Sequence, residues 1–554
     1  MALVLTPPAF GRSTPPDPAG LAHRAYVVGR LAQSDNDLAR AATAYATAMA
    51  QDAGHPLIKR RAFELALAAG DEKLSFRLAQ QLAQNPKADA TLHLALLSQS
   101  LMEKDWKAYD RERIILAPSG FANLLLPVVH AWTLEARGQR AAAIQLLSLP
   151  ANDLLVDSYH DEHRAYLLAR AGEIGEAAEI LSAIAKGSAA QDVRVRMAAA
   201  YYLQQNKQIE AARALLQEDS DDNIILRQAI RDLDKGKTLT LPPQDMTHGV
   251  ARLYTRLAQD LARDRETPIA LLLARMGQFL APDQSDALIT AAEMLARSGQ
   301  HSTALATLDK VSPKDPLIDL VRDRRISILE DMGRRAEALG LLAQKLQSAD
   351  ASVEDRIRYA DALRAQGDNR GALAQYDRAM AQVAKDDPRW QLWFLRGALR
   401  EQTGDWAGAE SDLRTALKRA PEEPTLLNYL GYAMLDRGIK LDEAQQLIQK
   451  AHDLRPDDQF ITDSLGWSYF LRGQYARAVP LLEKAFLGAP EDPTIGEHVG
   501  DAYWKVGRKL EARYRWQNAL ASAPEAEQAA RLARKIDLGY DLAHIPEAQK
   551  TANP

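Results

Sequence analysis

Two short motifs contain residue types that bind phosphate or act as nucleophiles, and each lacks one residue that its chemistry needs. The sequence KGKTLT at 235–240 contains Gly-Lys-Thr, but a phosphate-binding loop requires a further glycine where this chain has Arg231. The sequence GWSYF at 466–470 matches a nucleophile elbow until its last position, which is Phe470 instead of glycine. Neither motif predicts an active site.

A third motif could bind a metal ion. The sequence HDEH places His160 and His163 three residues apart, on one face of a helix. No further ligand is indicated nearby, so we expect a solvated polar face instead of a metal site. The chain has no cysteine, which excludes disulfides, thiolate zinc sites, iron–sulfur clusters and cysteine nucleophiles. We therefore expect no cofactor, no metal and no enzymatic activity.

The composition favours closely packed helices. Of the 554 residues 47% are apolar but only 6% are aromatic, so alanine and leucine make up most of the apolar share. The 69 basic and 74 acidic residues are interspersed, with a net charge of −5, and this lacks the basic excess of a nucleic-acid-binding protein. No apolar run approaches 18 residues, so no transmembrane helix is expected.

Glycines recur with a period close to 34 residues, and each is followed five residues later by an alanine. The glycines are Gly299, Gly333, Gly367, Gly404, Gly438, Gly473 and Gly507, and the alanines are Ala304, Ala338, Ala372, Ala409, Ala444, Ala478 and Ala512. The last four units carry a second glycine seven residues earlier, at Gly397, Gly431, Gly466 and Gly500. This pattern predicts pairs of helices. The glycines of the 299–507 series end the first helix of each pair in a left-handed turn. The alanines and the additional glycines let the two helices of a pair approach closely.

The first half of the chain shows the same period less clearly. Its turn positions are Asn36, Gly70, Lys104, Gly138, Gly172 and Asn206, and small residues follow at Ala41, Ser75, Ala143, Ala177 and Ala211. Lys104 suits a left-handed turn poorly, so we expect a degenerate unit there. The period then breaks. We predict a Pro-rich tail at 1–21, an array at 22–217 and a break at 218–247 that holds a helix at 222–234 followed by a loop. A second array follows at 248–524, and a capping helix with a tail at 525–554.

The 34-residue period and the small residues at fixed positions are typical of the tetratricopeptide repeat, which the chain resembles. The resemblance implies an all-α, right-handed α-solenoid of about fourteen helix pairs in two arrays, with a C-terminal capping helix. It also implies that the first helices of successive units line a concave groove that binds protein or peptide partners.

The resemblance places particular residues in that groove. The main predicted site consists of groove positions in the last three units, and acids among them would favour a ligand with lysine or arginine. These residues are Asn428, Tyr432, Asp463, Trp467, Phe470, Glu497, Asp501 and Trp504. A weaker secondary groove is expected at Trp132, Glu162 and Tyr166 in the first array.

The last repeats carry a further resemblance. The runs LNYLGYAMLDRG, DSLGWSYFLRGQY and EHVGDAYWKVGRKLEA resemble the end of long tetratricopeptide proteins of Gram-negative bacteria. These include lipoprotein adapters of carboxyl-terminal processing proteases. The resemblance implies a non-catalytic adapter or scaffold; the alternative is a structural subunit of a self-associated or envelope assembly. The sequence as written has no secretory signal and favours the cytoplasm, whereas an upstream signal would indicate the periplasm or envelope.

Overall fold

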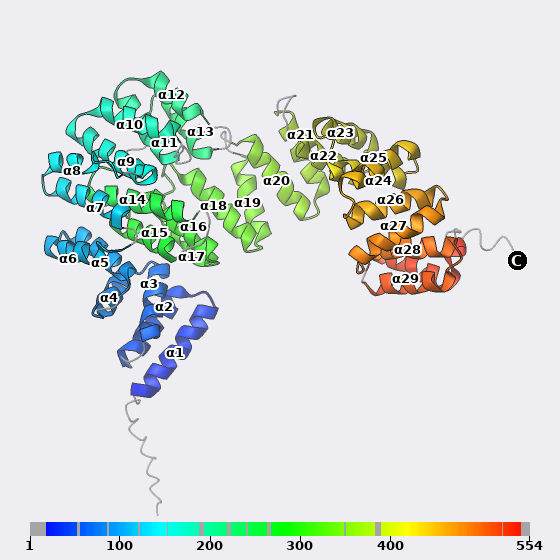
Figure 1. Cartoon of the computed structure of the whole chain (residues 1–554), viewed down its shortest axis with the longest axis horizontal. Coiled ribbons are helices and arrows are strands. Elements are labelled where there is room, and N and C mark those ends of the chain that lie inside the picture. Colours follow the sequence, from blue (N-terminus) through cyan, green and yellow to red (C-terminus); the bar gives the residue numbers. More distant parts are fainter. Residues whose placement is uncertain are drawn as a thin grey trace, which may run out of the picture. The chain divides into compact units, whose positions relative to one another are not determined.

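The chain is described by a computed structural model (Figure 1). The described residues are 18–51, 56–85, 88–119, 122–151, 153–187, 193–218, 223–239, 242–262, 268–347, 351–382, 389–522 and 524–543, and in these ranges all regular structure is helical. The predicted all-α fold is confirmed. None of the described helices is both long enough and apolar enough to span a membrane. Residues 1–17 of the predicted tail lie outside the described ranges, and residues 18–21 belong to the first helix.

The chain divides into two compact units, 1–341 and 342–554, and the boundary falls inside α19 (Arg335–Lys345). The other helices of the first unit are α1 (Pro18–Ser34), α2 (Leu38–Gln51), α3 (Pro56–Ala69), α4 (Glu72–Ala83), α5 (Ala90–Glu103), α6 (Trp106–Leu116), α7 (Ala122–Ala136), α8 (Arg140–Leu147), α9 (Leu154–Ala171), α10 (Ile174–Lys186), α11 (Val193–Gln205), α12 (Ile209–Gln217), α13 (Ile224–Asp234), α14 (Met246–Leu261), α15 (Pro268–Leu280), α16 (Ser285–Arg297), α17 (His301–Leu308) and α18 (Ile318–Asp331).

The second unit continues the pattern of helix pairs. Its helices are α20 (Val353–Ala365), α21 (Asn369–Met380), α22 (Trp390–Gln402), α23 (Trp406–Arg419), α24 (Pro424–Asp436), α25 (Leu441–Leu454), α26 (Gln459–Leu471), α27 (Tyr475–Gly488), α28 (Pro493–Lys505), α29 (Lys509–Ala521), α30 (Ala526–Leu538) and α31 (Tyr540–Ala543). Successive helices pack against each other, and the first helices of neighbouring pairs, such as α24 and α26, also touch.

The left-handed turns lie where the repeat predicts them, with two corrections. All seven glycines of the 299–507 series have positive φ, as do Gly70, Gly138 and Gly172. Lys104 also takes the left-handed turn, with φ of 53°, so the expectation of a degenerate turn there is wrong. In the sixth unit the left-handed residue is Lys207 instead of Asn206, so it follows Gly172 by 35 residues instead of 34. Correspondingly Ala212 is buried there and Ala211 is exposed.

The predicted close packing of the small residues is confirmed. The seven alanines of the series are buried against the preceding helix. At Gly466 an added Cβ would lie 2.7 Å from Cγ of Leu482 on α27. At Gly431 it would lie 2.8 Å from the main-chain oxygen of Ala444 on α25, which cannot move aside. Larger side chains at these positions would push the paired helices apart.

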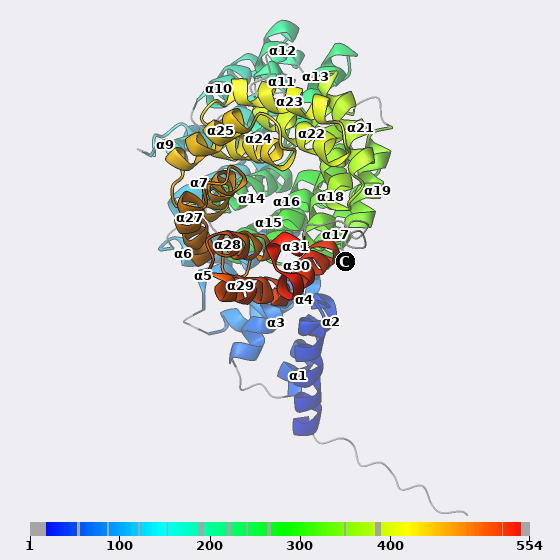
Figure 2. The ribbon, with the colours of Figure 1, turned by 90° about the vertical axis from the view of Figure 1, so that its right-hand side faces the viewer.

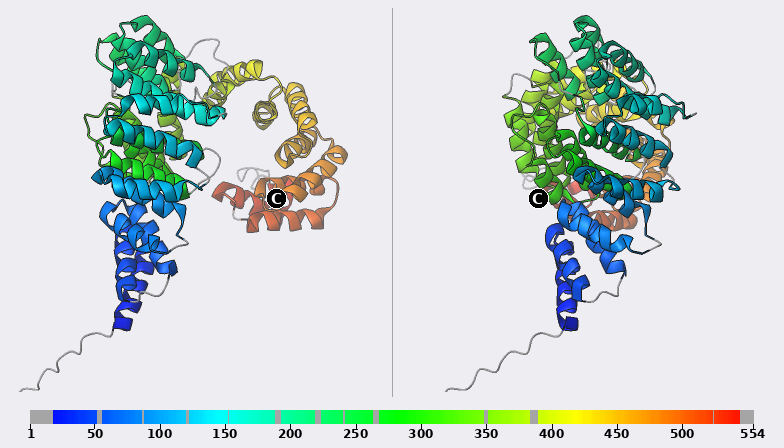
Figure 3. Two further views of the ribbon diagram at one scale, coloured as in Figure 1. Left: turned by 60° about the vertical axis from the view of Figure 1, so that its left-hand side comes forward. Right: turned by 90° about the vertical axis from the view of Figure 1, so that its left-hand side faces the viewer.

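The first unit folds back on itself. Helices α14 and α15 follow the interruption of the repeat and pack against α7, α5 and α3. In Figure 3 the green helices of this region lie beside the blue helices from earlier in the chain. The side chain of Trp132 on α7 lies directly over Gly249 on α14, where even a Cβ would clash with the indole ring. The predicted boundary at 218–247 is therefore not where the compact units divide. The helix predicted inside that segment is present as α13, which Asn223 caps.

The second unit ends in a cap. Helix α30 packs on α29, and Figure 2 shows it with α31 beside α28 and α29. It occupies the place that the first helix of a further pair would take. Leu532 is completely buried under this cap. A capping helix at this position was predicted, and residues 544–554 of the predicted tail lie outside the described ranges.

Candidate partner-binding surfaces

The acids of the predicted groove in the second unit are buried and paired within the chain. Glu497 on α28 accepts two hydrogen bonds from Arg531, at 2.7 and 2.9 Å, and one from Lys535 at 2.7 Å. Asp501 accepts from Lys535 at 2.6 and 2.8 Å and from the indole N–H of Trp516 at 3.0 Å. Both cations belong to the cap helix α30. The expectation that Glu497 and Asp501 attract a cationic ligand is therefore wrong.

Asp463 has a partner within the chain as well. Its carboxylate lies 2.9 Å from Nδ1 of His498, and both side chains are buried. Burial alone would lower the pKa of His498, but the charge of Asp463 outweighs it and the pKa is raised. The ring of His498 stacks on Trp467 with centroids 3.8 Å apart, and Trp467 stacks in turn on Phe470 at 4.5 Å. The stack of His498, Trp467 and Phe470 is thus partly a packing contact between α26 and α28.

Two further predicted residues contribute mainly to the cap. Phe470 is buried and packs edge-on against Tyr540. Trp504 lies against Gly539, and its indole N–H donates to Asp541 at 2.9 Å. Gly539 has φ of 80°, and a side chain there would clash with the ring of Trp504. A glycine at this position therefore allows the chain to turn so that the short α31 lies close to Trp504. Phe470 and Trp504 therefore hold the end of the solenoid together.

Some of the predicted groove remains available. Asn428 and Tyr432 lie four residues apart on one face of α24 and are half-buried, as is Trp467 on α26. Phe460, at the start of α26, has 52% of its surface exposed. The side-chain oxygen of Asn428 is buried and has no hydrogen-bond partner within the described chain. Burial raises the pKa of Tyr432 to about 12, so its hydroxyl stays protonated at neutral pH. These four residues are referred to below as the α24–α26 surface.

Trp132 and Glu162 of the predicted secondary groove are not open to a partner, and the buried Tyr166 lines the larger of two cavities described below. Trp132, Glu162 and Tyr166 are buried because the chain's own α14 lies against them. Arg252 and Arg256 on α14 donate to the two oxygens of Glu162 at 2.7 and 2.5 Å, and Tyr166 donates to it at 2.8 Å. Burial would raise the pKa of Glu162, but the two guanidinium groups lower it far below its usual range. This prediction is corrected: α14 fills the concave side there.

The two histidines of the HDEH motif are not on a solvated face. Both are buried on α9, and His163 accepts a hydrogen bond from the indole N–H of Trp132 at 3.0 Å. Burial lowers the pKa of His163 to about 3 and also lowers the pKa of His160. Within the described ranges no three histidine or acidic side chains gather closely enough to hold a metal ion.

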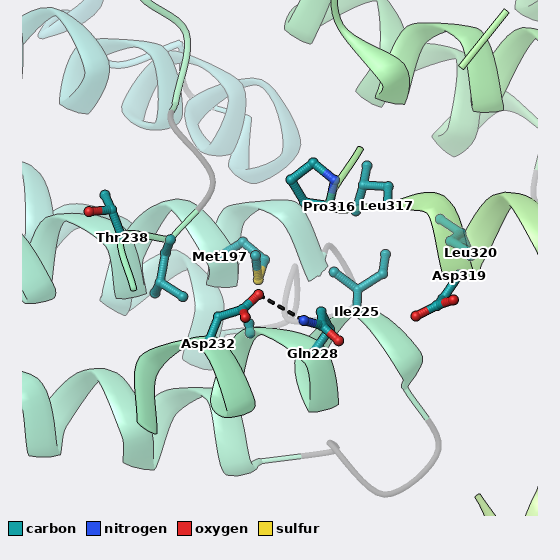
Figure 4. A pocket seen from close by; sticks show the side chains of 11 residues that line it. Met197, Ile225, Gln228, Asp232, Thr238, Pro316, Leu317, Asp319 and Leu320 are labelled. Atoms are coloured by element: carbon teal, nitrogen blue, oxygen red, sulfur yellow. Dashed lines mark hydrogen bonds between the residues drawn. The ribbon is translucent and has the colours of Figure 1, made fainter. Parts of the chain in front are cut away.

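Sequence reasoning missed a groove near the Gly-Lys-Thr motif. Gly236 forms the turn after α13, and Lys237 pairs with Asp232 at 3.0 Å. Next to this turn, residues of α11 and α13, Thr238 and Leu239, and the start of α18 line a cavity of about 250 Å³ (Figure 4). A neighbouring cavity of about 480 Å³ extends towards α14 and α16. The break in the repeat was one sequence signal for this site, and Tyr166 of the predicted secondary groove was another, because it lines the larger cavity.

The ion cluster at the cap predicts a specific loss of stability in acid. Burial would raise the pKa of Glu497, but Arg531 and Lys535 outweigh it and lower the pKa to about 2. A depressed carboxyl pKa stabilises the fold above the unfolded value near 4.5 and loses that contribution as the pH falls through about 2. Calorimetry of the full chain between pH 5 and 2.5 should show a loss of ~2–3 kcal/mol that Glu497→Gln does not share. Glu491→Gln, at an exposed carboxylate, should behave like wild type; identical pH profiles for all three proteins would contradict this assignment.

Comparisons with known proteins gave the following similarities. No protein-family model matches the chain. A segment of 193 residues is 34% identical to a TPR repeat-containing protein of Pseudomonas aeruginosa, and the match covers 34% of this chain and 31% of that relative. Among solved structures, a tetratricopeptide repeat protein from Parabacteroides merdae is 19% identical with a TM-score of 0.38, covering 46% of this chain and 97% of its own. YrrB, a TPR protein with an unusual peptide-binding site, is 17% identical with a TM-score of 0.28, covering 35% of this chain and 97% of its own.

The paired helices, the left-handed turns and the packed small residues define an α-solenoid. The 34-residue period is that of the tetratricopeptide repeat, and the Pseudomonas aeruginosa relative is named for the same repeat, so the fold is an α-solenoid of the tetratricopeptide-repeat type. Such solenoids are protein–protein interaction scaffolds. The number of repeats remains a prediction.

Proposed function

We propose that this protein is a non-catalytic adapter that holds a partner segment on the α24–α26 surface of its second unit. The exposed ring of Phe460 and the half-buried Tyr432 and Trp467 provide aromatic contact area. Aromatic side chains of this kind are the usual anchors of protein interfaces. The last repeats resemble adapters of carboxyl-terminal processing proteases, and we propose a comparable bridging role here.

The observation that carries the proposal is the side-chain oxygen of Asn428. It is buried and lacks a hydrogen-bond partner in the described chain. An unsatisfied buried acceptor costs about 1–3 kcal/mol, and a main-chain N–H of a bound peptide would remove that cost. The neighbouring acids already have their own partners within the chain in Arg531, Lys535 and His498. The ligand is therefore selected by its main chain and its apolar side chains, and positive charge is not required.

The proposal is tested by affinity capture from the native host's lysate with three full-length baits. They are wild type, Asn428→Ala with Phe460→Glu, and Leu487→Glu. Leu487 lies on α27, the second helix of its pair, and 81% of its surface is exposed. Leu487→Glu therefore introduces the same charge as Phe460→Glu, but outside the α24–α26 surface. A partner retained by wild type and Leu487→Glu and depleted at least about tenfold by the double variant supports the proposal. Equal capture by all three baits rejects it.

A second candidate function is self-assembly, and one observation favours it. Helix α1 exposes Val27, Val28 and Leu31, which share one face at three- and four-residue spacing. Light scattering of the purified chain distinguishes the two candidates. A stable multimer that Leu31→Glu dissociates supports assembly, whereas a monomer at micromolar concentration supports the adapter.

A further inference from the structure

The segment that interrupts the repeat builds a groove in the first unit. Helix α13 and the loop that follows it lie opposite the start of α18, with α11 between them (Figure 4). The two cavities of about 250 and 480 Å³ share four lining residues, Met197, Ile225, Pro316 and Leu317. They are therefore two depressions of one elongated groove, called here the α11–α13–α18 groove.

The walls of this groove are apolar and offer few main-chain donors. Met197, Ile225 and Leu317 are half-buried and form the wall common to both depressions. Pro242 and Pro243 line the larger depression, and Pro316 lines both. Because proline has no N–H, these wall segments cannot pair with a ligand strand as a sheet edge would. Recognition in the groove must come from side chains.

The charged groups that line the groove are mostly carboxylates. Asp232 and Asp319 line the smaller depression with only 18% and 28% of their side chains exposed. Their partners Lys237 and Arg322 are 61% and 55% exposed, so the cations lie towards solvent. Ion pairs of this exposure are weak and readily exchanged. In the larger depression Asp315 accepts from the main-chain N–H of Leu317 and from the hydroxyl of Ser285, both neutral donors.

The larger depression also contains opposite charges, which are paired with its other acids. Arg194 lies 2.7 Å from Asp286, and His248 lies 3.1 Å from Asp283. Arg252 is engaged by the buried Glu162. Among the described residues, the hydrogen bonds given for Asp315 come from neutral donors, and Asp319 follows four residues later at the start of α18. The field inside the groove is consequently negative over an apolar wall.

We propose that the α11–α13–α18 groove binds an extended peptide segment that places apolar side chains in its two depressions and a lysine or arginine against Asp315 and Asp319. The two depressions fit side chains projecting from one continuous strand, and the carboxylates supply a site for a cation between apolar contacts. This site lies in the first unit and does not depend on the α24–α26 surface. A chain with both sites could hold two partners together and raise their effective concentration.

The test begins with a displayed library of random dodecapeptides selected on the full-length chain, with depletion on Ile225→Lys. Selected peptides are synthesised with a fluorescent label, and their dissociation constants are measured by polarisation. Ile225→Lys places a cation in the apolar wall, and Ile209→Lys is the matched control at an exposed residue of α12. Asp315→Asn with Asp319→Asn removes the two charges but keeps oxygen acceptors. Asp331→Asn, exposed at the end of α18, is its control.

The proposal predicts selected peptides with net positive charge and interspersed apolar residues. Their affinity should fall at least about tenfold in Ile225→Lys and about three- to tenfold in the double aspartate variant, with a weaker salt dependence in the latter. Both control variants, and Asn428→Ala in the second unit, should bind like wild type. Selected peptides that are acidic, or that bind both groove variants as tightly as wild type, would overturn it. So would a selection that yields no peptide.

Discussion

Replacing Glu162 by alanine is expected to lower the free energy of unfolding of the first unit by about 3–5 kcal/mol. The substitution leaves Arg252 and Arg256 buried without the carboxylate that both guanidinium groups contact. It also removes the acceptor of the Tyr166 hydroxyl. Because these contacts join α9 to α14, the fold of the first unit back onto itself depends on them. Hydrogen exchange followed by mass spectrometry should show faster exchange in α9 and α14 and unchanged exchange in α24–α29.

Two control variants make this prediction specific. Glu179→Ala removes an exposed carboxylate from the neighbouring α10 and should change the stability by less than about 0.5 kcal/mol. Replacing Glu162, Arg252 and Arg256 together by methionine removes every buried charge of the cluster and should recover much of the lost stability. If Glu162→Ala is as stable as Glu179→Ala, α14 is not held in the way the contacts indicate.

Replacing Lys535 by alanine is expected to destabilise the second unit by about 3–5 kcal/mol. Lys535 is buried and is the cation common to Glu497 and Asp501. Without it Glu497 keeps the hydrogen bonds from Arg531, whereas Asp501 keeps the hydrogen bond from the neutral indole N–H of Trp516. Chemical unfolding followed by circular dichroism measures the loss, and hydrogen exchange assigns it to α28–α30.

The pH dependence of this variant is a separate check. Burial already raises the pKa of Asp501 above its usual value, and loss of Lys535 would raise it further. A raised carboxyl pKa means that protonation favours the folded form, so the deficit of Lys535→Ala should shrink as the pH falls from 7 to 5. Adding Asp501→Asn should reduce the deficit at pH 7, and Lys418→Ala, at an exposed lysine of α23, should have little effect. A deficit that does not change with pH would contradict the assigned pairing.

The sequence was sufficient to predict those features that depend on neighbours within one repeat. Gly466 and Ala478 could be placed at a helix contact because one helix and its turn determine both positions. Lys104 shows the limit of that reasoning. Its left-handed conformation costs roughly 1–2 kcal/mol, and the fixed length of the turn imposes it regardless of residue type.

The contents of the candidate site were harder to predict. Glu497 and Arg531 are 34 residues apart, as are Asp501 and Lys535, and Asp463 and His498 are 35 apart. Side chains at equivalent positions of successive first helices therefore meet, so opposite charges one period apart carried a signal for these pairs. The contact of Glu162 with Arg252 joins residues 90 positions apart across a break in the period. A periodic pattern holds no information about such a contact.

The most direct test of the adapter account is site-specific photo-crosslinking with p-benzoylphenylalanine placed at position 460 or at position 487. Both positions are exposed, and they belong to neighbouring helices of the same pair, α26 and α27. The account predicts that position 460 crosslinks the captured partner, that Asn428→Ala weakens this crosslink, and that position 487 does not crosslink it. A partner that crosslinks at position 487 and not at position 460 would place binding on the second helices and contradict the account.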